Sequence, residues 1–192
     1  MRYLFIIIFI LIFSNNVFAK DKLENVFVGY ETLEMTMNKF QNFAGEVGYR
    51  IDERYQIRLT IMEVKLTERH LSSKYEAAAI DGEDVEGYFR GYEVHFDRYF
   101  SKRWYVSANF GYYEDTYKHT ILSDRIENKT LTFGSGIGYK YTDLFGVNGV
   151  YLNVSVPVRF YFNKIEEQKL GSATVRTHLI VNNLWLFLGY EF

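Results

Sequence analysis

The 192-residue sequence contains no cysteine and a single proline. Without cysteine, neither a disulfide framework nor a thiolate metal site can form, so a domain of this size must be stabilised in another way. One proline is compatible with a chain that consists mostly of strands, because proline removes a backbone donor from a hydrogen-bonded ladder. An aromatic content of 19% supports the same prediction, since aromatic residues are enriched in strands.

The sequence also lacks a surplus of positive charge. Its 22 lysine and arginine residues face 24 acidic residues, which gives a net charge of −2. No basic surplus is present to neutralise phosphates, so we predict no nucleic-acid partner. After the first 19 residues, no apolar run approaches the roughly 20 residues of a spanning helix. If this chain crosses a membrane, it must do so as a closed sheet, in which every backbone polar group is paired.

The amino-terminal segment has the pattern of a secretory signal peptide. Arg2 supplies a basic start, residues 4–13 are uninterruptedly apolar, and Val17-Phe18-Ala19 is a small-x-small cleavage pattern. We expect cleavage after Ala19, so that residues 1–19 are removed and residues 20–192 form one domain. An uncleaved anchor is the alternative, but the apolar run is shorter than a spanning helix requires.

Apolar residues recur at every second position along most of the remaining chain. Residues 184, 186, 188, 190 and 192 are apolar or aromatic, whereas Gly189 and Glu191 lie on the opposite face. A period of two over this length predicts a strand with one apolar face. The same criterion predicts eight strands, at residues 24–33, 42–51, 55–68, 87–99, 103–117, 129–142, 149–163 and 176–192.

The predicted connections differ in length between the two ends of the strands. Short ones fall near Asp52, Ser101 and Asp143, and longer ones fall near Asn38, Ala78, Asp124 and Gln168. This asymmetry is typical of membrane barrels, in which short turns face one side and long loops face the other. The fold class that we predict is all-β: an eight-stranded antiparallel up-and-down transmembrane β-barrel.

Alternation alone leaves open which face points outward. A soluble barrel turns its apolar face inward, whereas a membrane barrel turns it toward lipid. The membrane arrangement is favoured because glycines gather on the polar face and because the strands reach the roughly 9–11 residues of a spanning strand. Aromatic residues near the strand ends predict two interfacial girdles, formed by Tyr99, Phe100, Trp104, Tyr141 and Tyr190 at the short turns and by Phe40, Phe43, Tyr88 and Tyr112 toward the long loops.

The third predicted strand changes its pattern partway along. After Ile61, the apolar residues Met62, Val64 and Leu66 occupy the face that carried polar residues before, and Glu63 and Lys65 occupy the other. Either a β-bulge lies at this point, or the strand projects beyond the lipid.

The inward face of the predicted barrel collects ten ionisable side chains. An eight-stranded barrel has room inside only for side chains, so charges buried there must pair. We therefore predict a salt-bridged network that largely closes the lumen, and a proton or ion path is the alternative. The predicted members are Glu31, Glu46, Arg50, Arg58, Glu93, His95, Asp97, Lys140, Arg159 and Glu191.

No catalytic, cofactor or metal site is predicted from the sequence. Glu93, His95 and Asp97 share one face of one strand and are the nearest approach to such a site. A second histidine is not expected beside them, which favours a structural role for His95 over a metal ligand.

The signal peptide, the eight strands, the unequal connections and the terminal Phe192 together resemble small outer-membrane β-barrels of the OmpA-transmembrane and OmpX type. Tyr190-Glu191-Phe192 is similar to the closing segment that the barrel-assembly machinery reads in such proteins, with Tyr190 and Phe192 as the assembly signal. The resemblance implies a monomer in the bacterial outer membrane, in contact with membrane lipid and lipopolysaccharide. It further implies a non-enzymatic structural or surface-interaction role, which the fold alone does not determine.

Two other functions stay open at this point. Some small outer-membrane barrels modify lipid A, and their deacylase type carries a His-x-Ser pair on a strand near the rim. Here His70-Leu71-Ser72-Ser73 contains such a spacing, but it falls at a loop mouth and not within a predicted strand, so nucleophile, base and orienting group have no evident placement. The other alternative is a narrow channel for small or hydrophobic solutes. Lipid hydrolysis discriminates the first alternative, and planar-bilayer conductance the second.

Overall fold

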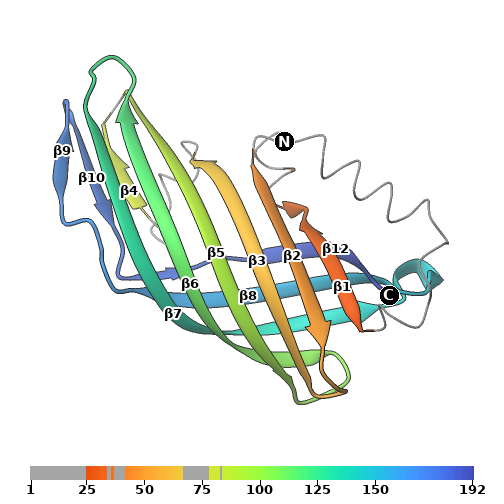
Figure 1. The fold of residues 1–192 in the computed structure, drawn as a ribbon. Coiled ribbons are helices and arrows are strands. Elements are labelled where there is room, and N and C mark those ends of the chain that lie inside the picture. Colours follow the sequence, from red (N-terminus) through yellow and green to blue (C-terminus); the bar gives the residue numbers. More distant parts are fainter. Residues whose placement is uncertain (1–24, 34–35, 37–41, 67–77, 83) are drawn as a thin grey trace.

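The computed structural model describes residues 25–33, 36, 42–66, 78–82 and 84–192, which form a closed antiparallel barrel (Figure 1). Its strands are β1 (Val26–Glu31), β2 (Phe43–Arg50), β3 (Tyr55–Leu66), β5 (Val85–Tyr99), β6 (Trp104–His119), β7 (Arg125–Thr142), β8 (Val150–Tyr161) and an eighth made of β11 (Ile180–Asn182) and β12 (Trp185–Glu191). Pairing of β1 with β12 closes the sheet, which confirms the predicted eight-stranded barrel. The predicted signal peptide lies outside the described residues.

The eighth strand is interrupted where it passes the single proline of the sequence. β11 and β12 both pair with β8, and they do so in one continuous register. Between them Asn183 lies opposite Pro157, which has no N–H to donate to the ladder, although the Asn183 N–H still reaches the Pro157 carbonyl at 3.3 Å. The prediction of one uninterrupted strand over residues 176–192 is therefore wrong. Residues 176 and 177 belong instead to β10 (Ala173–Thr177).

β5, β6 and β7 are the longest strands of the barrel, and we call their end portions the wing (residues 85–90, 114–119 and 125–130). In the wing β7 extends beyond β8, while residues 87–90 of β5 still pair with β3. Because β6 and β7 continue so far, their connection is shortened to residues 120–124, and the longer loop expected there is absent.

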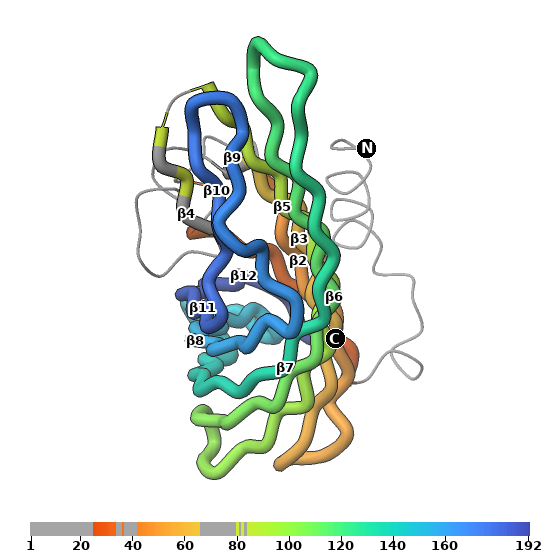
Figure 2. The backbone as a smooth tube through the Cα atoms, turned by 90° about the vertical axis from the view of Figure 1, so that its left-hand side faces the viewer, coloured from red at the N-terminus to blue at the C-terminus, as the bar shows by residue number. Residues whose placement is uncertain are grey.

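A second, smaller sheet lies at the same end of the molecule as the wing (Figures 1 and 2). We call it the cap; it consists of β4 (Ala78–Asp81), β10 and β9 (Gln168–Leu170), in that order. The connections near Ala78 and Gln168 are long, as predicted, but they are not simply loops, because a segment of each pairs with β10. The remaining element, η1 (Leu144–Gly146), forms part of the short connection between β7 and β8.

β3 continues past Ile61 without a bulge. Its pairing with β5 is unbroken from Tyr55 to Leu66, so the inward and outward faces never exchange. Met62 is consequently buried inside the barrel, while Glu63 points outward. Apolar residues occupy the inward face from Met62 onward because the interior of the barrel becomes apolar at this height. Of the two alternatives, a β-bulge or a strand that projects beyond the lipid, the bulge is therefore wrong.

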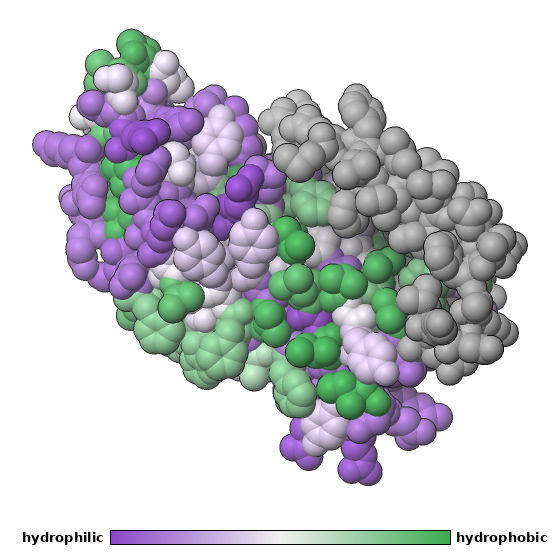
Figure 3. Space-filling model, in the orientation of Figure 1, coloured by the Kyte–Doolittle hydropathy of each residue, from purple (hydrophilic) through white to green (hydrophobic). Residues whose placement is uncertain are grey.

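Over most of the barrel wall, apolar side chains point outward and polar ones inward. On β6, Val106 and Phe110 are 47% and 63% exposed, whereas Ser107 and Asn109 are buried. Figure 3 shows the resulting apolar band between the hydrophilic wing at upper left and the hydrophilic short turns at lower right. So extensive an exposed apolar surface marks a site of contact with protein or membrane. No helix among the described residues is long and apolar enough to span a membrane.

A row of charged side chains forms the upper border of this band. Glu63, Arg90, Glu114 and Lys129 are direct neighbours across four strands. Arg90 pairs with Glu63 at 3.1 Å, and Lys129 pairs with Glu114 at 3.3 Å. The row immediately below consists of Ile61, Tyr92, Tyr112 and Leu131. The outer surface thus changes from apolar to charged within one side-chain step.

Glycines on the inner face create space for aromatic rings. Four glycines lie directly opposite an inward aromatic residue on a neighbouring strand, and a Cβ atom at any of them would collide with that ring. The pairs are Gly48 with Phe27, Gly91 with Tyr113, Gly138 with Tyr105, and Gly189 with Tyr151. Packing of this kind accounts for the gathering of glycines on the polar face and pins the strand register.

Tyr99 departs from the predicted aromatic girdle. Its side chain is buried inside the barrel, where its hydroxyl donates to Gln56 Oε1 at 3.1 Å. The expectation of a lipid-facing Tyr99 is wrong because this residue shares the inward face of β5 with Asp97 and His95.

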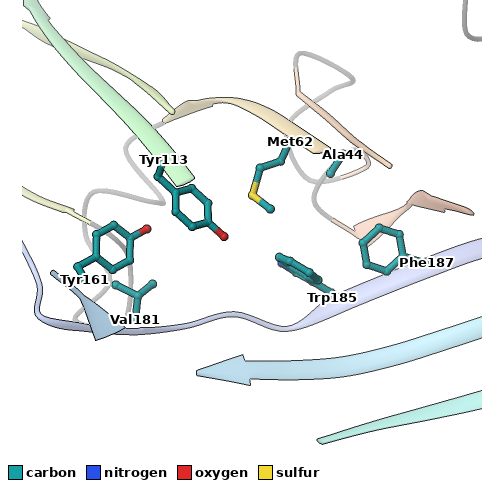
Figure 4. Close-up of a cluster of buried hydrophobic side chains, with 7 residues drawn as sticks. All are labelled: Ala44, Met62, Tyr113, Tyr161, Val181, Trp185 and Phe187. Atoms are coloured by element: carbon teal, nitrogen blue, oxygen red, sulfur yellow. The ribbon is translucent and has the colours of Figure 1, made fainter. Parts of the chain in front are cut away.

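Toward the wing, the interior loses its charges and becomes apolar. The buried side chains there come from β2, β3, β6, β8, β11 and β12 and converge on one another (Figure 4). They are Ala44, Met62, Tyr113, Tyr161, Val181, Trp185 and Phe187. The barrel therefore holds two kinds of filling, with ionised groups in its lower and middle parts and an apolar cluster above them.

The outer surface of β6 provides a direct test of the band. In a lipid bilayer, Val106→Arg should lower the free energy of unfolding by about 2–4 kcal/mol, because it places a charge against hydrocarbon. Thr116→Arg is the matched control, since Thr116 lies on the same outward face but above the charged row. It should change the stability by less than about 0.5 kcal/mol. Urea unfolding in vesicles measures both, and equal effects would contradict the assignment of the band.

Candidate functional site: the charged interior of the barrel

Arg58 is the centre of the charged interior. It is 2% exposed and reaches acids on both neighbouring strands. Its Nη1 lies 2.9 Å from Glu46 Oε2 on β2, and its Nε lies 2.8 Å from Asp97 Oδ2 on β5. The ring of Tyr105 lies beside the guanidinium, with 5.7 Å between Arg58 Cζ and the ring centroid. One side chain on β3 thereby joins three consecutive barrel strands.

Neutral side chains add hydrogen bonds to these two acids, although Asp97 Oδ1 has no partner among the described residues. Tyr151 donates its hydroxyl to Glu46 Oε1 at 2.9 Å, and the Asn153 amide lies 3.3 Å from both oxygens of that carboxylate. Gln56 donates to Asp97 Oδ2 at 2.7 Å. Because buried charges are costly unless paired and hydrogen-bonded, such contacts are required for Arg58 and its acids to stay ionised.

Glu93 and Arg159 form a second ion pair, higher in the barrel. Arg159 Nε lies 2.9 and 3.0 Å from the two Glu93 oxygens, and its Nη2 lies 2.9 Å from Glu93 Oε2. Tyr113 donates to the same carboxylate at 2.9 Å, and Arg159 Nη1 donates to Asn183 Oδ1 at 2.9 Å. The guanidinium also lies over the Trp185 ring at 4.5 Å. This pair joins β5 to β8 across the lumen.

A third group of charges lies in the interior at the short-turn end. Glu191 accepts from Arg50 at 2.7 and 3.2 Å and lies 3.1 Å from Lys140 Nζ. Lys140 is 2% exposed and lies over the rings of Phe27 and Tyr151, at 3.8 and 4.2 Å from their centroids. A cation over an aromatic face gains electrostatic stabilisation in a desolvated site.

The structure places all ten predicted network residues on the inner face of the barrel. Eight of them form the three groups above, and a ninth, His95, links two of these groups. Glu31 differs in the contacts that it makes: its Oε1 accepts the backbone N–H of Leu33 and of Leu186, at 3.2 and 3.1 Å. The carboxylate of Glu31 therefore fixes the start of β12 against the end of β1.

His95 lies between the Arg58 group and the Glu93–Arg159 pair. Its Nδ1 lies 3.3 Å from Arg58 Nη2 and 3.2 Å from the Ser107 hydroxyl, while its Nε2 lies 3.4 Å from Glu93 Oε2. Because a guanidinium can only donate, Nδ1 must be the acceptor, and the proton of a neutral ring is assigned to Nε2. The imidazole thus connects two ion pairs.

Ser107, His95 and Glu93 together have the order of a serine-hydrolase triad, and sequence spacing gave no sign of it because they lie on two strands. The arrangement lacks what a nucleophile requires. Arg58 occupies the Nδ1 lone pair that would accept the serine proton, and His95 and Glu93 are fully buried. Glu93 is further engaged by Arg159. The triad order is consequently part of the ion-pair network. The His70-Leu71-Ser72-Ser73 segment lies outside the described residues.

Some interior polar groups have no hydrogen-bond partner among the described residues. Asn109 and Thr132 are 0% and 1% exposed, and their side-chain polar atoms make no hydrogen bond to other described residues. Internal water is the expected partner of such groups. In the described part of the chain, no cluster of three or more histidine, aspartate or glutamate side chains is arranged to hold a metal ion.

The pair of Glu93 and Arg159 allows a test of the network by a double-mutant cycle. Arg159→Met should cost about 3–5 kcal/mol of unfolding free energy, because it leaves a buried carboxylate without its partner. Adding Glu93→Gln should restore much of this loss, since the unpaired charge disappears. Urea unfolding followed by the fluorescence of Trp185, which lies beside Arg159, measures the cycle. Strictly additive losses would contradict a direct pair.

Comparison with solved structures finds small barrels of the same kind. Ail, the attachment invasion locus protein of Yersinia pestis, is 11% identical, with a TM-score of 0.45 over 88% of this chain and 97% of that chain. The N-terminal β-barrel domain of Pseudomonas aeruginosa OprF is 13% identical, with a TM-score of 0.43 over 88% and 98%. Neisserial surface protein A is 13% identical, with a TM-score of 0.44 over 87% and 94%.

No family model and no curated protein sequence matches the chain. At these identities and TM-scores the likeness concerns the fold alone, and the closed barrel is established here by its own strand pairing. That pairing confirms the eight-stranded barrel architecture that the resemblance implied.

Proposed function

We propose that this chain is a non-enzymatic protein of the bacterial outer membrane, which presents its wing and cap to the exterior and keeps its lumen closed by ion pairs. The observation that carries the proposal is the inverted distribution of side chains. Apolar residues cover the outside of the barrel, whereas paired charges fill the inside. Such a barrel is stable in lipid, and its narrow interior leaves room only for side chains.

The two ends of the barrel support an orientation in that membrane. The short connections lie at one end, and the wing and cap lie at the other. Short turns face the periplasm and longer elements face outward in proteins of this architecture. Removal of the signal peptide, residues 1–19, in the periplasm is part of the proposal.

The last strand supports assembly by the barrel-assembly machinery. Tyr190 and Phe192 lie on the outward face of the closing strand, and their rings pack edge to face with centroids 5.1 Å apart. An outward aromatic pair at the seam with β1 is accessible from lipid while the barrel closes. We assign these two residues as the assembly signal.

The charged row on the outer surface supports contact with lipid headgroups. Arg90 and Lys129 lie one side-chain step above the apolar band, at the height where phosphates of lipid or lipopolysaccharide would lie. Neither residue is buried, and each is paired with a single carboxylate. Positive and negative charges alternate along the row, which favours a position in the headgroup layer of a membrane over a binding site for nucleic acid. We propose a monomer that lipid surrounds on all sides.

A surface-interaction role follows from the shape of the outer end. Ion pairs occupy the interior, so the wing and cap carry the surfaces that a partner can reach. We rank this role above lipid modification because, among the described residues, the serine–histidine contact in the barrel, between Ser107 and His95, is buried inside it.

Surface labelling tests this proposal, and the absence of native cysteine makes single introduced cysteines unambiguous. Ser172→Cys lies at the exposed turn of the cap, and Lys102→Cys lies at an exposed short turn. In intact cells, an impermeant maleimide should label residue 172 and leave residue 102 unmodified until the outer membrane is permeabilised. Labelling of residue 102 alone, or of neither residue before permeabilisation, would overturn the proposed orientation.

A further inference from the structure

The cap is held to the wing by an apolar contact. The buried side chains of this contact are Tyr117 and Ile126 from the wing, Ile165 from the segment before the cap, and Leu170 and Val175 from the cap itself. Val64, Ile80, Val85 and Phe89 pack around them. One further tie joins Thr177 to Ile165, through a backbone hydrogen bond of 3.1 Å and a side-chain hydrogen bond of 2.6 Å.

The carboxylate of Asp115 is buried beside this contact. Asp115 is 1% exposed on the inner face of β6, between Tyr113 of the barrel cluster and Tyr117 of the cap contact. Its neighbours across the strands are Phe89 on β5 and Asn128 on β7. Asp115 lies above Glu114 of the charged row and therefore outside the lipid-facing part of the barrel.

Few hydrogen bonds stabilise the charge of the Asp115 carboxylate. Oδ2 accepts from the Asn128 amide at 3.5 Å, and Oδ1 has no hydrogen-bond partner among the described residues. The Asn128 amide is itself shared with the backbone carbonyl of Asn163 at 3.1 Å. In contrast to Glu46, Glu93 and Asp97 of the barrel interior, Asp115 has no arginine or lysine within salt-bridge distance in the described part of the chain.

The groups that face Asp115 are phenols, amides and apolar side chains. β6 contributes Tyr113 and Tyr117, β8 contributes Tyr161, and β5 and β7 contribute Phe89 and Asn128. Burial, followed by the neighbouring Asp115 carboxylate, raises the pKa of Tyr117 well above its ordinary value, so this phenol stays neutral. Burial also raises the pKa of Asp115 to about 7, against a smaller lowering by Asn128.

We propose that Asp115 is a pH-sensitive latch, which holds the cap on the wing while its carboxyl group is protonated and releases the cap when it ionises. A protonated carboxyl fits an apolar contact and can still hydrogen-bond to Asn128. Among the described residues no cation compensates an ionised carboxylate there, and undocking of the cap exposes it to water.

The sign of the effect follows from the direction of the pKa change. The docked cap binds the proton more tightly than the undocked one, so docking is strongest in acid and weakens as the pH rises toward the folded-state value of about 7. Between the ordinary value of 3.8 and about 7, the docking equilibrium constant falls by up to tenfold per pH unit. Above that range it is constant.

Cysteine accessibility measures the opening of the cap directly. Val175→Cys lies in the cap contact and is fully buried, whereas Ser172→Cys lies at the exposed cap turn. The ratio of their labelling rates with a methanethiosulfonate reagent cancels the intrinsic pH dependence of thiol reactivity. From pH 5 to pH 9 this ratio should rise by up to about 100-fold in the refolded protein, with a midpoint near 7.

In Asp115→Asn, the ratio of the two labelling rates should stay at the low value that the parent protein shows in acid, whatever the pH. The reason is that the amide has the shape of the carboxyl group and cannot ionise. Asp124→Asn, at an exposed position of the wing loop, should retain the full response. His119 lies against Gly171 of the cap turn and is unchanged in both variants. A ratio of labelling rates that does not change with pH in the parent protein would overturn the latch. An equal rise in Asp115→Asn would overturn it as well and would assign the pH response to another group, such as His119.

Discussion

Pairing of the buried guanidinium of Arg58 with two carboxylates is the interaction on which the rest of the barrel depends. A chain that turns its apolar residues outward has only polar residues left for its interior, and ionised groups are costly there unless each is paired and hydrogen-bonded. Arg58 satisfies this condition by reaching β2 and β5 from β3. His95 extends the connection to Glu93 and Arg159, and so to β8.

The same constraint explains the layers of the molecule. Where the outer surface is apolar, the interior carries ion pairs, with glycines opposite aromatic rings to make them fit. Where the outer surface becomes charged at Glu63 and Arg90, the interior becomes apolar at Met62 and Tyr113. Each part of the wall therefore has one polar and one apolar face. Within the lipid of our proposal the outward face is apolar, and above it the inward face is apolar. Asp115 is the exception, an acid on the apolar side of the upper part.

The barrel could be predicted from the sequence because strand alternation is local. The period of two identifies both which residues form strands and which side chains share a face, and it placed all ten network residues on the inside. The pairs themselves could not be read, since Arg58 and Glu46, or Glu93 and Arg159, meet only through the closure of the sheet. The cap was missed because β4, β9 and β10 are short segments that the pattern does not distinguish from loops. Pro157 interrupts the last strand from a distance, so its effect on residues 183 and 184 is equally invisible in the local pattern.

In our proposal, paired charges and packed rings close the lumen of the barrel. Recordings of ionic current through the purified, refolded protein in a planar lipid bilayer at neutral pH test this closure. No steady single-channel current is expected, because Arg58, Glu93 and Lys140 are each held by opposite charges or aromatic rings across the narrow interior. Stable ohmic currents that change in ion selectivity on Arg159→Met would instead show a continuous path through the barrel, and the lumen would not be closed.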